Sequence, residues 1–134
     1  VLQALRRYAE AEPLCVRTAR GFEASLGASH PDTATALCNL GSVLHALGRT
    51  DEAEAAYRRA LLSRKASFGE DHKATAACMR NLGLVLRAQG RADQAEPLFR
   101  KVARSQARLH GEDHPSTFAS VQEHGEALEA LHRH

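Results

Sequence analysis

The stretch Leu37–Cys38–Asn39–Leu40–Gly41 decides the fold of this chain, because a close copy, Met79–Arg80–Asn81–Leu82–Gly83, follows 42 residues later. Other positions match in the same register: Leu26–Gly27, Phe68–Gly69 and His110–Gly111; His30, His72 and His114; and Ala11–Glu12, Ala53–Glu54 and Ala95–Glu96. A fixed period of this length indicates a repeat array, in which each unit buries its apolar face against its neighbours. We therefore interpret residues 1–134 as one array, with a partial repeat at 1–26, full repeats at 27–68 and 69–110, and a terminal helix at 111–134.

The composition favours helices and excludes several classes of function. Hydrophobic residues make up 43% of the 134 residues, with much alanine and leucine and no tryptophan, and the net charge is only +2. So small a charge gives no electrostatic reason to expect nucleic acid or a membrane as partner. No apolar run approaches the roughly 20 residues that span a bilayer. Cys15, Cys38 and Cys78 form no CxxC pair, which favours free thiols in a reducing, cytoplasmic location.

Each repeat is expected to hold two helices. Pro31 suits the start of the first and Gly48 its end, in the left-handed conformation that glycine tolerates. Thr50 is expected to cap the next helix. Linkers this short make neighbouring helices antiparallel. The sequence predicts an all-α chain with helices at 1–6, 9–25, 31–47, 51–67, 73–89, 93–109 and 115–132.

Two features of the N-terminal and proline positions stand apart from this pattern. Val1–Arg7 has no initiator methionine and no signal-peptide core, and it reads as the middle of a helix, so we expect a piece of a longer array. Pro13 and Pro97 are expected about five residues into their helices. There each forfeits one backbone hydrogen bond and can bend the first turn.

These residues resemble a known family. Leu40–Gly41 followed by Ala53, Tyr57 and Ala60, and the linker Leu26–Gly27–Ala28–Ser29–His30–Pro31–Asp32–Thr33, are similar to the tetratricopeptide repeat in its 42-residue, kinesin light chain-like form. The resemblance covers essentially the whole chain. It implies a right-handed superhelical array of antiparallel helix pairs, an α-solenoid, whose function is protein–protein interaction. It also implies that the first helix of each repeat, helix A, lines a concave surface and that the second, helix B, lies outside.

The repeated glycines have a physical explanation of their own. Gly41 and Gly83 lie on the apolar face, where a side chain would hold two helices apart. Each glycine leaves a notch in the surface of its helix. We expect the small side chains of Ala53 and Ala95 to meet this notch, and Tyr57 and Phe99 to supply bulk between repeats.

The residues of helix A that point away from the packing face are the candidate binding residues. Asn39 and Asn81 stand out, because asparagine is a mediocre helix former whose amide both donates and accepts hydrogen bonds. The resemblance implies that they hold a peptide backbone or its terminal carboxylate. The alternative is that they bond to the next helix and serve packing. The other candidates are Thr35, Cys38, Ser42 and His45 in one repeat and Arg80, Leu84 and Arg87 in the next.

The third copy of the motif, in the terminal helix, departs from the pattern, since Glu123 replaces asparagine and His124 replaces leucine. A carboxylate clamp becomes doubtful there, because Glu123 would repel the terminus. The inward positions are Ala119, Gln122, Glu123, Glu126 and Glu129. Either the last helix is a polar cap, or Glu126 and Glu129 attract a basic ligand. Arg80 and Arg87 could also pair with these glutamates.

The remaining polar residues suggest structure rather than chemistry. His30, His72 and His114 occupy the same linker of successive repeats, too far apart to share one metal ion, so we expect them to bond linker backbone. Basic residues of helix B favour a solvated outer face, with a phosphate-binding or acidic-protein surface as the alternative. No nucleophile–base pair, phosphate loop, metal site or cofactor site is predicted.

The sequence therefore predicts a protein–protein interaction scaffold, not an enzyme. An extended peptide or a partner helix would lie in the helix-A groove, gripped by Asn39 and Asn81. The alternative is a structural spacer or self-assembly unit, whose ends associate through repeat stacking and whose apolar Val1–Leu5 stretch encourages that contact.

Overall fold

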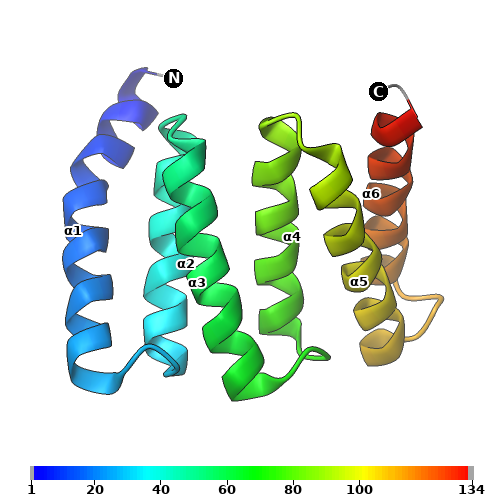
Figure 1. The fold of residues 1–134 in the computed structure, drawn as a ribbon, viewed down its shortest axis with the longest axis horizontal. Helices are drawn as coiled ribbons and strands as arrows, with labels where there is room; N and C mark the ends of the chain where they lie inside the picture. Colours follow the sequence, from blue (N-terminus) through cyan, green and yellow to red (C-terminus); the bar gives the residue numbers. More distant parts are fainter. Residues whose placement is uncertain (1, 133–134) are drawn as a thin grey trace. The chain divides into compact units, whose positions relative to one another are not determined.

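The computed structural model describes residues 2–132. These residues form six α-helices and no strand: α1 (Leu2–Leu26), α2 (Pro31–Ala46), α3 (Thr50–Phe68), α4 (Lys73–Ala88), α5 (Ala92–His110) and α6 (Pro115–His132), shown in Figure 1. The all-α prediction is confirmed. Val1, Arg133 and His134, which belong to the predicted terminal segments, lie outside the described residues.

The chain divides into two compact units, which are described separately. The first unit ends at Ser67 and holds α1, α2 and nearly all of α3. The second unit begins at Phe68 and holds α4, α5 and α6. Each unit therefore contains one full helix A–helix B pair and one further helix.

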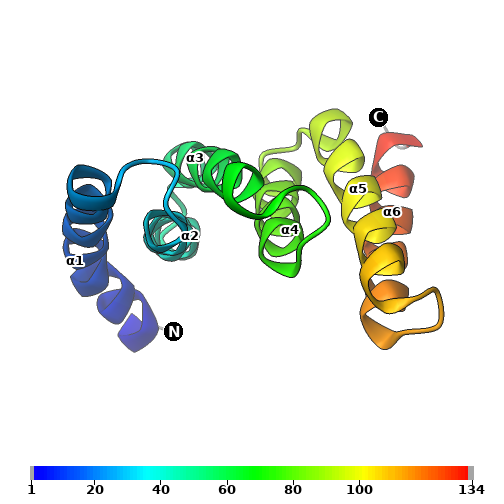
Figure 2. The ribbon, with the colours of Figure 1, turned by 90° about the horizontal axis from the view of Figure 1, so that it is seen from below.

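The predicted helix bounds hold within one residue for α2 to α6, but not for α1. We predicted a break between residues 6 and 9, and the structure has one helix of 25 residues from Leu2 to Leu26. The prediction was wrong because the segment between Arg6 and Ala9 contains neither glycine nor proline, so nothing stops the helix there. Pro13 consequently lies deep inside α1, whereas Pro97 lies in the early turns of α5. Figures 1 and 2 show that the N-terminal turns of α1 lean away from the rest of the helix, as a missing N–H inside a helix allows.

Glycine marks the helix ends, as predicted. Gly48 follows α2 with φ of +81°, and the same left-handed backbone recurs at Gly27, Gly69, Gly90 and Gly111. Thr50 is itself the first residue of α3, so it lies inside the helix rather than before it as the expected cap.

Each helix A packs on its helix B through a glycine and an aromatic ring. A Cβ atom placed on Gly41 would lie 2.9 Å from Cε1 of Tyr57, and one on Gly83 would lie 3.0 Å from Cζ of Phe99. Both rings are almost fully buried. The notch was expected to face Ala53 and Ala95. The nearest atoms to these glycines belong to the two rings, and Ala53 and Ala95 are buried with no exposed surface.

The glycine contact yields a test by substitution. Gly83→Ala forces the Phe99 ring to move, and overpacking of this kind costs about 1–3 kcal/mol, more than the roughly 0.5–1 kcal/mol that alanine gains in helix propensity. Gly125 of α6 is the matched control, because a Cβ atom there meets nothing within 4 Å. We expect urea unfolding followed by circular dichroism to show a loss of stability for Gly83→Ala and a gain for Gly125→Ala. Equal shifts in the two variants would contradict the packing described here.

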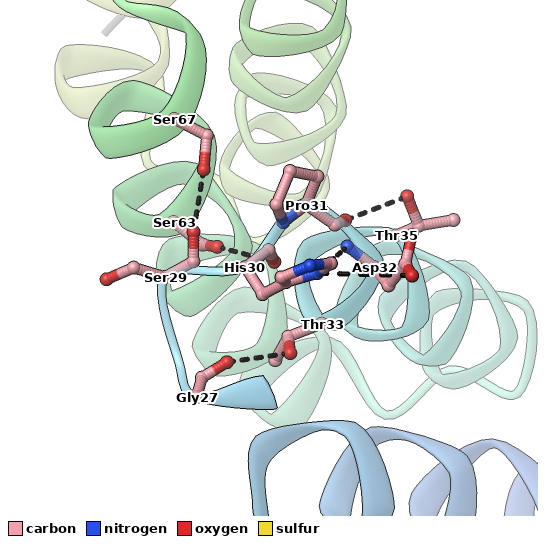
Figure 3. Close-up of polar contacts among 9 residues, drawn as sticks. All are labelled: Gly27, Ser29, His30, Pro31, Asp32, Thr33, Thr35, Ser63 and Ser67. Carbon is pink, nitrogen blue, oxygen red and sulfur yellow. Dashed lines mark hydrogen bonds and ion pairs between the residues drawn. The ribbon is translucent and has the colours of Figure 1, made fainter. Parts of the chain in front are cut away.

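The linker before α2 is fixed by side chains of the linker, of α2 and of α3 (Figure 3). In the first unit the Thr33 hydroxyl donates to the Gly27 carbonyl at 2.8 Å, and Nδ1 of His30 accepts from the backbone N–H of Asp32 at 3.1 Å. The hydroxyls of Ser63 and Ser67, on α3, donate to the carbonyls of His30 and Ser29 at 3.2 and 2.6 Å. The linker is therefore bound at both of its ends.

The same contacts recur in the second unit. Thr75 donates to Gly69 at 2.8 Å and Thr117 to Gly111 at 2.7 Å. His72 accepts from Ala74 at 3.0 Å and His114 from Ser116 at 3.1 Å. The histidines thus cap the first turn of each helix A, which requires their ring proton to sit on Nε2 in the neutral form. The three histidines have the structural role that was predicted, but the backbone groups they bond belong to the first turn of the helix and not to the linker.

The threonine contact can be tested with an isosteric change. Thr75 has no exposed surface, and Thr75→Val removes its part-buried hydrogen bond to the carbonyl of the exposed Gly69. Loss of one such hydrogen bond costs about 0.5–1.5 kcal/mol of unfolding free energy. Thr35→Val is the control, since the exposed Thr35 hydroxyl only donates to the Pro31 carbonyl of its own helix. A chemical denaturation series in which both variants match the wild type would show that the part-buried hydrogen bond contributes nothing.

Candidate functional site

The predicted binding residues of the first unit lie along α2, and they differ in what they offer to a ligand. Asn39 is exposed, and its amide has no hydrogen-bond partner within residues 2–132. Thr35 is exposed and His45 is half-buried. The exposed Ser42 shares a hydrogen bond of 2.9 Å with the Tyr57 hydroxyl, which ties α2 to α3.

Cys38 does not lie where the sequence prediction placed it. It was expected on the surface of helix A, but only 8% of it is exposed. The reason is geometric, because successive helical residues are about 100° apart, so the neighbour of an outward-facing asparagine turns toward packed surface. Cys38 therefore offers little surface to a ligand.

In the second unit, Arg80, Asn81, Leu84 and Arg87 lie along α4. Asn81 is half-buried, and its amide also has no hydrogen-bond partner in the described part of the chain. Leu84 is half-buried beside it. The side chain of Arg87 passes over the Phe99 ring, with 5.6 Å between Cζ and the ring centroid.

The arginines of α4 pair with glutamates of α6. Nε of Arg80 donates to both carboxylate oxygens of Glu123 at 2.9 Å, and Nη1 of Arg87 lies 3.4 Å from Oε2 of Glu126. The suggested pairing is thus present, but Arg80 takes Glu123 and not one of the two glutamates first considered. Because Glu123 is balanced by Arg80, its charge does not act alone on a ligand at this surface.

A hollow of about 470 Å³ lies on the same surface of the second unit. One of its lining residues, Gln106 of α5, has a buried oxygen, Oε1, that lacks a hydrogen-bond partner among residues 2–132. The repeat pattern did not point to Gln106. The positions 42 and 84 residues earlier are Arg64 and Phe22, so glutamine does not recur at this place in the repeat. Gln106 lines the hollow together with Arg80, Ser116, Ala119, Ser120, Gln122, Glu123 and Glu126.

Other polar contacts join neighbouring helices or lie along one helix. His124 holds the buried Glu96 through a contact of 2.7 Å between Nε2 and Oε2. Several basic residues of helix B are paired: Arg58 with Glu54, Arg59 with Glu23 and Arg108 with Asp71. These pairs agree with the solvated outer face that the sequence favoured.

The cysteines are free thiols, and two of them are buried. Burial raises the pKa of the Cys15 thiol, and the neighbouring Glu12 carboxylate raises it further, so Cys15 stays protonated at neutral pH. No group of three His, Cys, Asp or Glu residues within 2–132 is placed to hold a metal ion. Of the helices in that same range, none has the length and apolar character needed to cross a membrane.

Comparison with known proteins agrees with this architecture. The family model of the tetratricopeptide repeat matches residues 1–65, 39–107 and 75–134. The chain belongs to the tetratricopeptide repeat family. Members of this family are generally protein-interaction scaffolds and are typically not enzymes.

Solved structures share the fold at low sequence identity. The "kinesin light chain nearly identical TPR-like repeats" of Podosopora anserina superpose with a TM-score of 0.85 at 24% identity, over 96% of this chain and 64% of that one. BtubC (BKLC) from P. vanneervenii superposes with a TM-score of 0.83 at 20% identity, over 93% of this chain and 50% of that one. This tetratricopeptide chain thus spans about half to two thirds of the length of these relatives. None of the curated proteins searched matches it in sequence.

Proposed function

We propose that this tetratricopeptide chain binds an extended peptide or a partner helix on the helix-A surfaces, α2 in the first unit and α4 in the second. The amides of Asn39 and Asn81 hydrogen-bond the ligand's backbone. One observation carries the proposal: both amides lack a partner within residues 2–132, although they hold the same position of successive repeats. Asparagine in mid-helix is less favourable than alanine, and no internal hydrogen bond offsets that cost here.

The chemistry of an amide suits this role. A side-chain amide presents one acceptor and two donors, so it can pair with a backbone N–H and a backbone C=O of the ligand together. Such contacts hold a peptide without reading its side chains. The packing alternative required these amides to bond a neighbouring helix, and the described residues offer no such bond.

The second unit adds polar groups that select the ligand. Glu126 is 51% exposed at the side chain beside the hollow. A peptide with N–H donors or a basic side chain fits this acceptor better than an acidic one. Arg80, held by both oxygens of Glu123, orders this surface and is less available to a carboxylate.

The proposal is tested by selecting peptides from a phage-displayed library of random linear sequences and measuring their affinity by fluorescence anisotropy. One lost hydrogen bond is worth about 0.5–1.5 kcal/mol, so Asn81→Ala should weaken binding about twofold to tenfold, and the double variant with Asn39→Ala should weaken it more. Alanine is the better helix former, so the variants keep their fold and a loss of affinity is not unfolding.

Isotope labelling supplies a direct readout. Asn39 and Asn81 are the only asparagines in the sequence, so labelling with ¹⁵N-asparagine gives two side-chain NH₂ signals. Both should shift when a selected peptide binds. Peptides that bind the double variant as tightly as the wild type, or leave both signals in place, would remove the site assignment.

A further inference from the structure

Helix α5 carries a positively charged surface, which we call the basic face. It consists of Arg100, Lys101, Arg104 and Arg108, and all four side chains are exposed. Their spacing places them within about 100° around the helix and about 12 Å along it. No acidic residue follows Glu96 in α5, so no carboxylate of the same helix lies among the four cations.

Two cations of the basic face have no partner within the described part of the chain. Lys101 and Arg104 make neither an ion pair nor a hydrogen bond among residues 2–132. Arg108 differs from them, because its Nη1 donates to both carboxylate oxygens of Asp71 at 3.0 Å. The basic face therefore keeps positive charge that no neighbouring carboxylate balances.

The matching helix α3 balances its charge in a way that α5 does not. Arg59 of α3 holds the place of Lys101 and pairs with Glu23 of α1. The residue 42 positions after Glu23 is Lys65, which is itself basic. The acid that neutralises Arg59 accordingly has no counterpart in the sequence for Lys101.

This side of helix B is exposed in the middle of the chain as well. Helix α3 has α1 and α2 before it and α4 to α6 after it. Its residues at the positions of the basic face are all exposed: Arg58, Arg59, Leu62 and Ala66. Leu62, which holds the place of Arg104, is 70% exposed. The exposure of the basic face is therefore the ordinary state of this side of helix B between other repeats.

The surroundings of the basic face indicate which kind of anion fits it. A hollow of about 140 Å³ beside it is lined by Lys101, Arg104, Arg108, Ser105, Met79, Glu70 and Asp71. Glu70 and Asp71 belong to the linker before α4, and their carboxylates limit the length of the positive surface. Phe99, the only phenylalanine, tyrosine or tryptophan of α5, is fully buried, so the face offers no such ring for the base stacking that binds single-stranded nucleic acid. A short run of carboxylates fits this surface better than a long polyanion.

We propose that the basic face of α5 binds an acidic segment of a partner protein. The Arg104 guanidinium takes one carboxylate through two parallel hydrogen bonds, and the Lys101 ammonium pairs with another as a point charge. Opposite charge on the two surfaces steers their encounter and selects the partner. The surface belongs to helix B, so it acts independently of peptide binding by Asn39 and Asn81.

The test measures the binding of a fluorescein-labelled peptide, whose glutamates lie three and four residues apart, by fluorescence anisotropy. We expect this peptide to bind, and to bind more weakly as salt is raised, whereas the same peptide with glutamine at each glutamate should not bind. Lys101→Gln with Arg104→Gln removes two exposed ion pairs and should weaken binding about twofold to thirtyfold. Both residues are exposed, so circular dichroism should show an unchanged fold.

The matched control removes the same charge from α1. Arg17→Gln with Arg20→Gln changes the positions that match Lys101 and Arg104, and both arginines are exposed and without a partner among residues 2–132. The other two positions of this face hold Val16 and Ala24 in α1, so its positive charge is half that of α5. We expect the control to bind the acidic peptide as the wild type does.

Three results would overturn the proposal. One is an acidic peptide that binds no better than its glutamine form, and another is an equal loss of affinity in the α1 and α5 variants. The third is a single-stranded oligothymidine that binds more tightly than the peptide and loses its affinity in the α5 variant, which would assign the face to nucleic acid. The variant with Asn39→Ala and Asn81→Ala should bind the acidic peptide normally, so failure of one proposal is distinguishable from failure of the other.

Discussion

The close approach of a helix glycine to an aromatic ring is the contact on which the rest of this structure depends. At Gly41 and Gly83 the place of a Cβ atom is already taken by Tyr57 and Phe99, so no larger residue fits without displacing a buried ring. Ala53 and Ala95, each four residues before a ring on the same helix, have no exposed surface. Because the contact joins the two helices of one repeat, it must recur with each repeat. The contact at Gly83 accordingly follows the one at Gly41 by 42 residues.

The linkers convert this packing into a defined surface. A glycine ends helix B, a histidine caps helix A, and a buried threonine returns a hydrogen bond to the glycine carbonyl. These contacts fix where helix A begins, and with it the rotation of every later residue about the helix axis. The outward direction of Asn39 and Asn81 is therefore set up in the linkers, well before the asparagines themselves. A polar contact of low individual energy thus determines which side chains a partner can reach.

Sequence reasoning was accurate where one residue type has one physical role, and less so where side-chain reach decides. The repeated glycines correctly marked helix ends, and five of them have positive φ in the structure. The repeat period correctly grouped the three capping histidines. The continuity of α1 was missed because the copies of its first turns, at 43–50 and 85–92, contain Gly48 and Gly90, which end a helix, whereas Arg6 holds that place in α1. Arg80 was linked to the wrong glutamates, since long side chains can choose among several partners on a facing helix. Gln106 left no repeated signal at all. Cys38 was placed on the outer surface of helix A from its helical position, but it borders the packing face and is buried.

The two faces of helix A differ in their packing. Two helical positions separate Asn39 from Gly41, about 200° around the axis, so the proposed binding face and the packing face lie on opposite sides. Along the array the packing position stays glycine at 41, 83 and 125, while the outward position changes from asparagine to Glu123. The Arg80–Glu123 pair shows that such a change is absorbed locally, by a charge on the neighbouring helix. Exposed pairs of this kind contribute little to stability, so a change at the outward position costs the fold little, whereas a side chain larger than hydrogen at Gly41 or Gly83 has to displace a buried ring.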